Sequence, residues 1–431
     1  MLQLASLVDE LRWRGLLHQY TEGVEEWLAR GPLSAYVGFD PTASSLHVGN
    51  LVPVMGLVHV QRTGNRPIAL VGGGTGLIGD PSGKSAERPF LEEEIIAENA
   101  RAIGAQLERF LDFDGANAAV MMDNAAWLRP LRMVDFLRDV GKHFTVNYMT
   151  AKESVKSRLE EGISFTEFSY MLVQAYDYLQ LHQREGVTLQ LGGSDQWGNI
   201  LTGVELIRRT TGHEAHAITH PLVTAADGKK FGKTEAGAVW LDPTRTSPYR
   251  FFQFWINADD RDVGRYMRLF TLLSREEIAA LETELREHPE RRGAQRALAL
   301  DVTARVHGDE VARVVAAASN VLFGEGEALT PDVLRALWGE IPSVEVPLST
   351  LAADDDAGQV DTVKLIVAAR LAPSKGAARR LLQQGGIYLN NERLGAEQTR
   401  VPPSARLHGR YFFLRRGKRE YALVAVRESS L

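Results

Sequence analysis

The chain contains no cysteine, and this absence excludes several kinds of chemistry. Disulfide bonds, thiolate metal sites and a catalytic thiol all require that residue. No run in the sequence approaches the roughly 18 apolar residues that a membrane-spanning helix needs. Residues 1–17 are amphipathic and charged, so we expect a helix there rather than a signal peptide. These features fit a cytoplasmic protein in a reducing compartment.

Charge is distributed unevenly along the chain. The 431 residues carry a net charge of −6, yet residues 362–431 hold 14 lysines and arginines against 4 aspartates and glutamates. A basic segment attached to an acidic body favours contact with a polyanion. A merely solvated basic surface is the alternative that charge alone leaves open.

The hydrophobic pattern predicts alternating strands and helices in the first part of the chain. Short apolar runs at 67–71, 118–122 and 188–191 are typical of buried strands, and residues 92–111 have helical periodicity. This alternation predicts an α/β fold with a doubly wound parallel sheet. Ligands bind such sheets at the carboxyl ends of the strands.

The pattern changes beyond residue 248. Amphipathic helices are expected at 275–288, 292–307 and 309–323, with no strand between them. Two prolines and three consecutive aspartates then indicate a linker, and the basic segment after it predicts two helices and a short strand. The expected parts are a Rossmann-like catalytic domain at 1–247, a helical domain at 248–340, a linker at 341–361 and a small α+β domain at 362–431.

Two familiar phosphate-binding patterns are present only in part. Residues 74–79 match GxGxxG after a strand, but Asp80-Pro81-Ser82-Gly83 follows where the pattern needs a helix, so NAD or FAD is not expected. Gly83-Lys84-Ser85 ends like a Walker A loop. Its first glycine would have to stand at position 78, which is Ile78, so a P-loop is not expected either.

Two other segments fit a nucleotide better. Residues 40–50 place His47 beside Gly49 and Asn50, ahead of an apolar, helix-like run. Glycine allows a ligand to approach the backbone, and a helix N-terminus favours phosphate. Residues 227–234 form a glycine-rich loop with three lysines, which can close over a polyphosphate. Their presence together, in this order, is more informative than either segment alone.

Together these segments resemble the HIGH and KMSKS motifs of class I aminoacyl-tRNA synthetases. They read His-Val-Gly-Asn at 47–50 and Lys-Phe-Gly-Lys-Thr at 230–234. Over nearly the whole chain the sequence resembles the bacterial tyrosyl-tRNA synthetases. The strings that carry this resemblance are Tyr36-Val-Gly-Phe-Asp-Pro-Thr, Gly76-Leu-Ile-Gly-Asp-Pro-Ser-Gly-Lys, Ser164-Phe-Thr-Glu-Phe-Ser-Tyr, Gly192-Gly-Ser-Asp-Gln-Trp-Gly-Asn and Phe251-Phe-Gln-Phe-Trp-Ile-Asn.

The resemblance implies a function, substrates and partners. It implies activation of L-tyrosine by ATP with Mg²⁺ to give tyrosyl-adenylate and pyrophosphate, followed by transfer of tyrosine to tRNA(Tyr). It also implies a homodimer, no membrane contact, no tightly held protein metal, anticodon binding by residues 248–340 and RNA binding by residues 362–431. Asn50 departs from the last histidine of HIGH, and Gly232 and Thr234 replace the serines of KMSKS.

The site residues are carried over position by position. The catalytic residues expected are His47, Asn50, Lys230, Lys233 and Thr234. ATP is expected to contact Gly38, Asp40, Thr42, His47, Gly49, Asn50, Gly193, Asp195, Lys230 and Lys233, with Lys84 and Arg88 near the phosphates. Tyrosine is expected to contact Tyr36, Asp80, Tyr170, Gln174, Asp177 and Gln196. Phosphates of tRNA are expected to contact Lys152, Arg208, Arg209, Lys375, Arg379, Arg380, Arg415, Arg416, Lys418 and Arg419.

Three alternative functions remain open at this point. A tryptophanyl-tRNA synthetase would share the fold, although pairing Tyr36 with Asp177 favours a phenol over an indole. A nucleotidyltransferase with an HxGH motif would need neither the helical segment nor the basic one. An RNA-binding relative without activity would be expected to have lost His47 and the lysines, and this chain keeps them.

Overall fold

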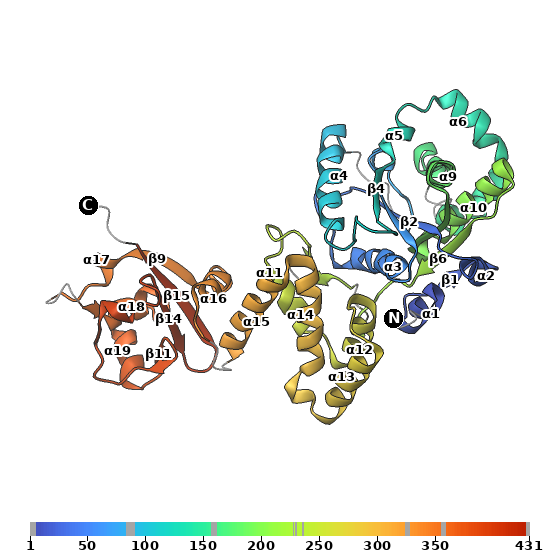
Figure 1. Cartoon of the computed structure of the whole chain (residues 1–431). Coiled ribbons are helices and arrows are strands. Elements are labelled where there is room, and N and C mark those ends of the chain that lie inside the picture. Colours follow the sequence, from blue (N-terminus) through green and yellow to red (C-terminus); the bar gives the residue numbers. More distant parts are fainter. Residues whose placement is uncertain are drawn as a thin grey trace. The chain divides into compact units, whose positions relative to one another are not determined.

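The computed structural model describes residues 6–82, 91–156, 162–226, 228, 231–234, 237–323, 328–354 and 359–427. The chain forms two compact units, shown in Figure 1. The first comprises Met1–Thr246 with Asn257–Val306, and the second Ser247–Ile256 with His307–Leu431. No helix among the described residues is both long and apolar enough to cross a membrane.

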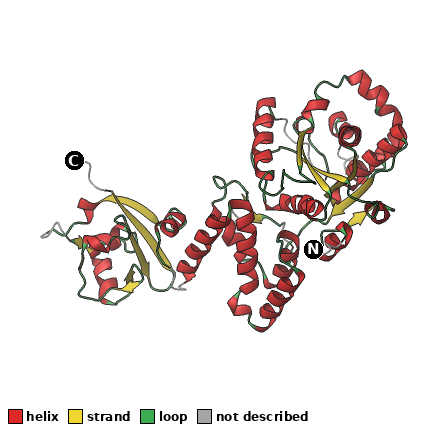
Figure 2. Ribbon diagram, in the orientation of Figure 1, coloured by secondary structure: helices red, strands yellow, loops and turns green. Residues whose placement is uncertain are grey.

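The first unit is built on a six-stranded sheet in the order β1-β6-β5-β2-β3-β4, with helices packed around it in Figure 2. All neighbouring strands are parallel except β1 and β6. The predicted doubly wound α/β class is therefore confirmed. The strands are β1 (Gln19–Tyr20), β2 (Ser34–Phe39), β3 (Arg66–Val71), β4 (Val120–Asp123), β5 (Val187–Gly193) and β6 (His216–His220).

The strand order places a switch point between β2 and β5. From β2 the chain winds outward to β3 and β4, and later returns to the other side of β2 for β5 and β6. Loops leaving the carboxyl ends of β2 and β5 therefore diverge, which opens a crevice for ligands. β3 is buried along nearly its whole length, and this explains its continuous apolar sequence at 67–71.

Helices cover the sheet of the first unit. α9 begins where Ser164 accepts a hydrogen bond from the Glu167 N–H, and it ends at Gly186 in the left-handed region. It packs closely on α10, because a Cβ at Gly203 would lie 2.8 Å from the Tyr178 ring. The helices of this unit are α1 (Leu7–Arg14), α2 (Val24–Leu28), α3 (Leu51–Arg62), α4 (Glu93–Leu107), α5 (Ala125–Leu128), α6 (Met133–Asp139), α7 (Val146–Thr150), α8 (Glu153–Lys156), α9 (Phe165–Glu185), α10 (Trp197–Thr211), α12 (Asp260–Phe270), α13 (Arg275–Glu287) and α14 (Gly293–His307).

The second unit contains a five-stranded sheet in the order β12-β11-β14-β15-β9. Alternate residues of β14 enter different cores: Phe412 and Leu414 pack with α18 and α19, while Tyr411 and Phe413 pack with α15 and α16. Both faces of the sheet are thus buried. The elements are α11 (Pro248–Ile256), α15 (Asp309–Phe323), α16 (Pro331–Leu337), β9 (Ser343–Pro347), α17 (Leu348–Leu351), β10 (Val360–Asp361), α18 (Thr362–Ala368), α19 (Lys375–Gln383), β11 (Ile387–Leu389), β12 (Glu392–Arg393), β13 (Arg400–Val401), β14 (Tyr411–Arg416) and β15 (Glu420–Arg427).

The compact units differ from the expected sequence parts in two respects. The helices of residues 248–340 are shared between them, with α12 and α13 in the first unit and α15 and α16 in the second. Within residues 341–361, expected to be a linker, β9 pairs in parallel with β15, where Val344 is the partner of Val424. This part of the segment therefore belongs to the sheet.

Candidate active site at the switch point of the sheet

The carboxyl end of β2 supplies an open stretch of backbone and a carboxylate. Gly38 is exposed, and a Cβ placed on it would meet no atom within 4 Å, so a ligand can approach this strand closely. Asp40 follows the strand. Its carboxylate accepts from Thr75 Oγ1 at 2.7 Å and from the Tyr170 hydroxyl at 2.8 Å. Loops after β2 and β3 are thereby tied to α9.

Asp177 is a buried carboxylate on α9. One oxygen accepts from Trp127 Nε1 at 2.7 Å and the other from Asn124 Nδ2 at 2.9 Å. Burial raises the pKa of Asp177 to about 7, although the two N–H donors act in the opposite direction. Asn124 also accepts from the Gly74 N–H at 2.7 Å, so the loop after β3 and the carboxylate share one support.

Tyr36 lies on β2 with its hydroxyl fully buried. Among the described residues, that hydroxyl has no hydrogen-bond partner. Burial first, and then the charge of Asp177, raise the pKa of Tyr36, which indicates that the two side chains lie near each other. A buried polar group without a partner is costly, so a ligand that supplies one would gain affinity here.

A second polar cluster joins the loop after β3 to α9 and α10. Asp80 accepts from Gln196 Nε2 at 2.5 Å. The Asn199 amide nitrogen lies 3.0 Å from Gln174 Oε1 and 3.3 Å from Gln196 Oε1, so both glutamine carbonyls face the same donor. The predicted tyrosine contacts other than Tyr36 therefore belong to two hydrogen-bond networks around α9.

The HVGN segment (residues 47–50) forms a tight cap before α3. His47 Nδ1 accepts from the Gly49 N–H at 3.1 Å, and the His47 N–H donates to Asn50 Oδ1 at 3.0 Å. A Cβ at Gly49 would lie 2.9 Å from the imidazole, so a larger residue would displace the ring. The Asn50 amide oxygen is the acceptor in this cap. α3 begins at the next residue, so the partial positive charge of its N-terminus lies at the HVGN segment.

The described part of the lysine loop lies against the HVGN segment. Val48 N donates to Val239 O at 2.9 Å, and the Val239 N–H donates to Gly232 O at 3.0 Å. Gly232 adopts φ 78°, and a Cβ there would lie 2.7 Å from Val48 Cγ2. β7 (Lys233–Thr234) pairs with β8 (Gly237–Ala238).

Several predicted contacts lie outside the described residues or are exposed. Lys84, Arg88 and Lys230 lie outside the described residues, and only the backbone of Lys233 and Thr234 is described. Thr42 and Asp195 are exposed. Gly193 ends β5, and a Cβ there would lie 2.5 Å from Asp195 Oδ1, so this glycine permits the aspartate's position.

The predicted tRNA contacts fall into two groups. On α10, Arg208 and Arg209 both form ion pairs with Glu205, at 2.7 and 2.5 Å. The hydrogen bond from Arg208 is the largest cause that lowers the pKa of Glu205 to about 2. Lys152 lies over the Tyr148 ring at 4.2 Å. Of the predicted contacts in the second unit, Arg415 stacks on Tyr388 and Arg416 binds Glu420. The others are exposed: Lys375, Arg379, Arg380, Lys418 and Arg419.

The carboxylates of Asp40, Asp80 and Asp177 all accept hydrogen bonds from the protein. Both oxygens of Asp40 and of Asp177 already accept hydrogen bonds from the protein. Asp80 accepts from Gln196 and from the Ser82 N–H. Among the described residues, no group of three or more histidines and carboxylates is placed to hold an ion.

Sequence reasoning missed the residues that support the site. Asn124, Trp127, Thr75 and Asn199 hold the predicted tyrosine contacts in place. Asn124 could have been suspected, because it follows a predicted strand at the ligand-binding edge of the sheet. Its partners stand about 50 positions away in the sequence, and no local pattern encodes such pairs.

Comparisons with known proteins now define the class. The family "tRNA synthetases class I (W and Y)" matches residues 28–324, and the family "Tyrosine--tRNA ligase SYY-like C-terminal domain" matches residues 339–424. The fold is thus that of a class I tRNA synthetase.

Individual relatives narrow the assignment. The tyrosine--tRNA ligase of Anaeromyxobacter dehalogenans is 55% identical over 98% of this chain and 100% of its own, and that of Bacillus caldotenax is 52% identical over 97% and 99%. A C-terminally truncated mitochondrial tyrosyl-tRNA synthetase of Aspergillus nidulans is 30% identical, with a TM-score of 0.68 over 74% of this chain and 95% of that one. The chain belongs to the tyrosine--tRNA ligase family.

Proposed function

We propose that this protein activates L-tyrosine with ATP and transfers it to the 3′ end of tRNA(Tyr). The observation that carries the choice of tyrosine is the buried, unsatisfied Tyr36 hydroxyl near Asp177. A substrate phenol can donate its hydrogen to the carboxylate and accept from Tyr36. Phenylalanine would leave the Tyr36 hydroxyl without a partner and would give Asp177 no further donor. An indole has a donor but no acceptor, so tryptophan would leave the Tyr36 hydroxyl without a partner.

The activation step needs positioning more than acid–base catalysis. A carboxylate oxygen of tyrosine forms a bond to the α-phosphorus of ATP, and the bond from that phosphorus to pyrophosphate breaks. The nucleophile is already ionised, so no side chain has to remove a proton. Catalysis then comes from orienting the reactants and from stabilising charge on the phosphates. In the second step a terminal ribose hydroxyl of tRNA attacks the acyl carbon, and AMP leaves.

We assign the amino-acid contacts to Tyr36 and to the two polar networks. Tyr36 and Asp177 bind the phenol. Asp80, Tyr170 and Gln174 surround the ammonium group, and the Asp80 carboxylate supplies the opposite charge that such a group requires. Gln196 lies beside the carboxyl group.

The nucleotide contacts follow the open edge of the sheet. His47, Gly49, Asn50 and Thr42 bind the phosphates and ribose at the N-terminus of α3. The remaining proposed contacts are Gly38, Asp40, Gly193 and Asp195, with Lys230, Lys233 and Thr234 for the leaving pyrophosphate. Mg²⁺ would arrive with the ATP polyphosphate, since hard cations of this kind are commonly bound through substrate phosphates.

We also propose the remaining partners. The exposed basic side chains of residues 362–431 bind tRNA, and two copies of the chain associate in the cytoplasm. Met133 and Val134 on α6 and Val146 on α7 are 68%, 74% and 65% exposed, and such apolar exposure supports a dimer face near residues 130–148. The assignment of anticodon binding to residues 248–340 and of RNA binding to residues 362–431 remains our proposal, with β9 counted as part of the C-terminal sheet.

The test is amino-acid-dependent exchange between ATP and labelled pyrophosphate, followed by charging of tRNA. Tyrosine should support exchange, while phenylalanine and tryptophan should not. Exchange supported by tryptophan alone would overturn the substrate assignment. A protein that shows no exchange with any amino acid and does not charge tRNA would favour a nucleotidyltransferase instead.

A further inference from the structure

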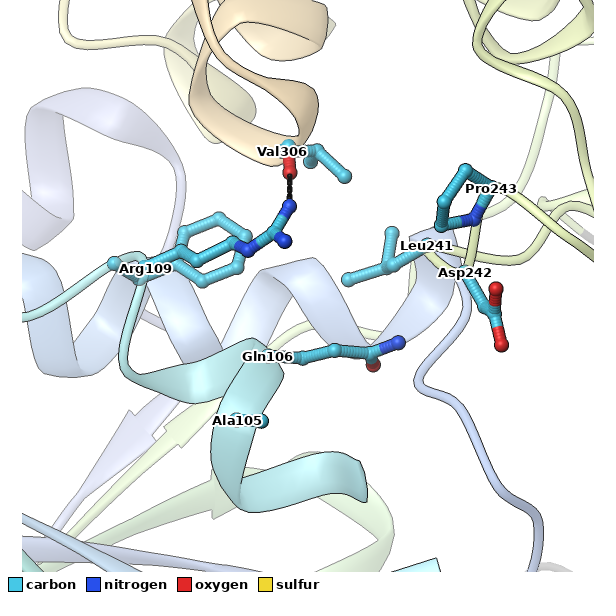
Figure 3. Close-up of a pocket in the computed structure, with 8 residues that line it drawn as sticks. Ala105, Gln106, Arg109, Leu241, Asp242, Pro243 and Val306 are labelled. Atoms are coloured by element: carbon cyan, nitrogen blue, oxygen red, sulfur yellow. Dashed lines mark hydrogen bonds between the residues drawn. The ribbon is translucent and has the colours of Figure 1, made fainter. Parts of the chain in front are cut away.

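Behind the HVGN segment, a side chain from α4 holds the peptide that precedes His47. Gln106 Oε1 accepts from the Leu46 N–H at 2.8 Å, and Gln106 Nε2 donates to Ser45 Oγ at 3.0 Å. Figure 3 shows Gln106 extended from α4 toward the segment that carries Leu241 and Asp242. The glutamine therefore fixes two consecutive residues immediately before the catalytic histidine.

Ser45 is the centre of this arrangement. Its hydroxyl donates to Leu46 O at 2.6 Å and accepts from Gln106 Nε2 and from the Asp242 N–H, the latter at 3.1 Å. A hydroxyl offers one donor and two acceptor positions, so all three are used. Ser45 is 4% exposed, and water cannot readily replace a partner that is lost.

The same bonds reach the end of the lysine loop. Leu46 O also accepts from the Leu241 N–H at 2.9 Å, and His47 pairs with Trp240 as an isolated bridge. Residues 239–241 directly follow β8, which pairs with β7, so they end the lysine loop. Gln106 and Ser45 thus form one hydrogen-bond network at the start of the HVGN segment and at the end of the lysine loop.

We propose that Gln106 is a positioning residue for the activation step, holding the HVGN segment and the lysine loop in register for ATP. This inference rests on the proposed function. Gln106 does not touch the reactants and acts through Leu46 and Ser45. Displacing reacting groups by about 1 Å can cost about a hundred-fold in rate, so loss of this support should appear in the nucleotide step.

The chain provides a matched control for an amide that only stabilises the fold. Gln61, on α3, donates to Asp112 O at 2.6 Å and accepts from the Asp112 N–H at 2.9 Å. Like Gln106, it uses both its amide oxygen and its amide nitrogen in hydrogen bonds. Its partners do not belong to the nucleotide-binding segments.

The experiment compares Gln106→Met with Gln61→Met in the full-length chain. Methionine keeps the length of glutamine and loses both hydrogen bonds. A cavity of about 110 Å³ beside Gln106, lined also by Arg109, Leu241 and Val306, leaves room for it. We expect Q106M to lower kcat/KM for ATP in pyrophosphate exchange by about ten-fold or more, with KM for tyrosine changed by less than about two-fold. Q61M should leave both close to wild type.

Ser45→Ala provides the second variant. It should also lower kcat/KM for ATP while leaving KM for tyrosine nearly unchanged. The double variant with Q106M should lose less kcat/KM for ATP than the two single losses combined, because both substitutions disrupt the same hydrogen-bond network. If Q106M does not fold, as judged by circular dichroism and melting, S45A carries the test alone. Equal effects on ATP and tyrosine, or a Q106M variant indistinguishable from Q61M, would overturn the role of Gln106. A wild-type protein without tyrosine-dependent exchange would overturn the proposed function as well.

Discussion

The two halves of the candidate active site are built differently. The subsite that we propose for tyrosine is made of side chains that already hold one another: Trp127 and Asn124 bind Asp177, and Tyr170 binds Asp40. The subsite that we propose for the nucleotide consists of exposed backbone at Gly38 and of the loop before α3. A preformed, buried subsite suits selection among similar amino acids, while an open subsite suits a large nucleotide that must enter and leave as pyrophosphate and AMP.

The largest expected effect tests the buried subsite. Asp177→Asn should lower kcat/KM for tyrosine by about a hundred-fold, because the carboxylate that accepts the phenol is replaced by an amide. KM for ATP should change little. Steady-state exchange assays measure both, with Asp332→Asn on the surface of α16 as control. Equal losses for both substrates would show that the two subsites are not separate.

The next test addresses the open subsite. His47→Ala should lower kcat for exchange by about ten- to a hundred-fold with KM for tyrosine unchanged, because His47 is assigned to the phosphates in the transition state. His182→Ala, at the C-terminal end of α9, is the matched control. An H47A variant with wild-type kcat would contradict the assignment of the HVGN segment.

Removing the unsatisfied hydroxyl should have opposite effects on stability and on binding. Tyr36→Phe should weaken tyrosine binding by about ten-fold, since one hydrogen bond to the phenol is lost. The free protein should become more stable by about 1 kcal/mol, because a buried group without a partner is removed. Equilibrium binding and urea titration measure the two effects. A variant that is less stable and binds tyrosine as tightly as wild type would contradict the proposal that the Tyr36 hydroxyl is unsatisfied in the free protein and binds the phenol.

The elevated pKa of Asp177 predicts a dependence of stability on pH. The folded pKa of about 7 lies above that of an unfolded aspartate, so the folded state retains a proton between about pH 4 and 7. This contribution is fully present below about pH 4 and is lost as pH rises through 7. Between pH 5 and 7, wild type should therefore lose about 1.4 kcal/mol per pH unit relative to D177N. Denaturant titrations at pH 5, 6, 7 and 8 test this, and a constant difference would contradict it.

The smallest expected effect lies outside both subsites. The triple variant Lys375→Ala, Arg379→Ala and Arg380→Ala should raise KM for tRNA by about three- to ten-fold at moderate salt, because exposed phosphate contacts are individually weak. Pyrophosphate exchange should stay unchanged. Affinities measured over a range of salt concentrations should show a shallower slope for the variant, and an unchanged slope would argue against phosphate contacts at α19.

The sequence predicted what depends on local pattern. The strand at 67–71 was found because buried parallel strands are apolar throughout, and it is confirmed as part of β3. The strand expected at 188–191, where Thr188 and Gln190 interrupt the apolar pattern, is confirmed as part of β5. Helices were found from their periodicity, and α13 and α15 lie close to the expected limits. β9 was missed, because a short edge strand bounded by prolines has no such pattern.

The candidate site was predicted by motif, whereas its internal support was not. The structure collects Tyr36, Asp177 and Tyr170 around α9, although their roles remain predictions. The bonds from Asn124 to Gly74 and from Gln106 to Leu46 join residues 50 to 60 positions apart. Pairs of this kind depend on how the sheet winds, and no spacing rule in one sequence predicts them.

The pairing of β9 with β15 has a practical consequence for dissecting the chain. β9 covers one edge of the C-terminal sheet, although it precedes the basic segment in sequence. A fragment that began at Thr362 would leave the hydrogen-bonding edge of β15 uncovered along most of its length. Exposed edges of that kind pair with other chains, so such a fragment should aggregate. A fragment that began before Ser343 would keep that edge closed.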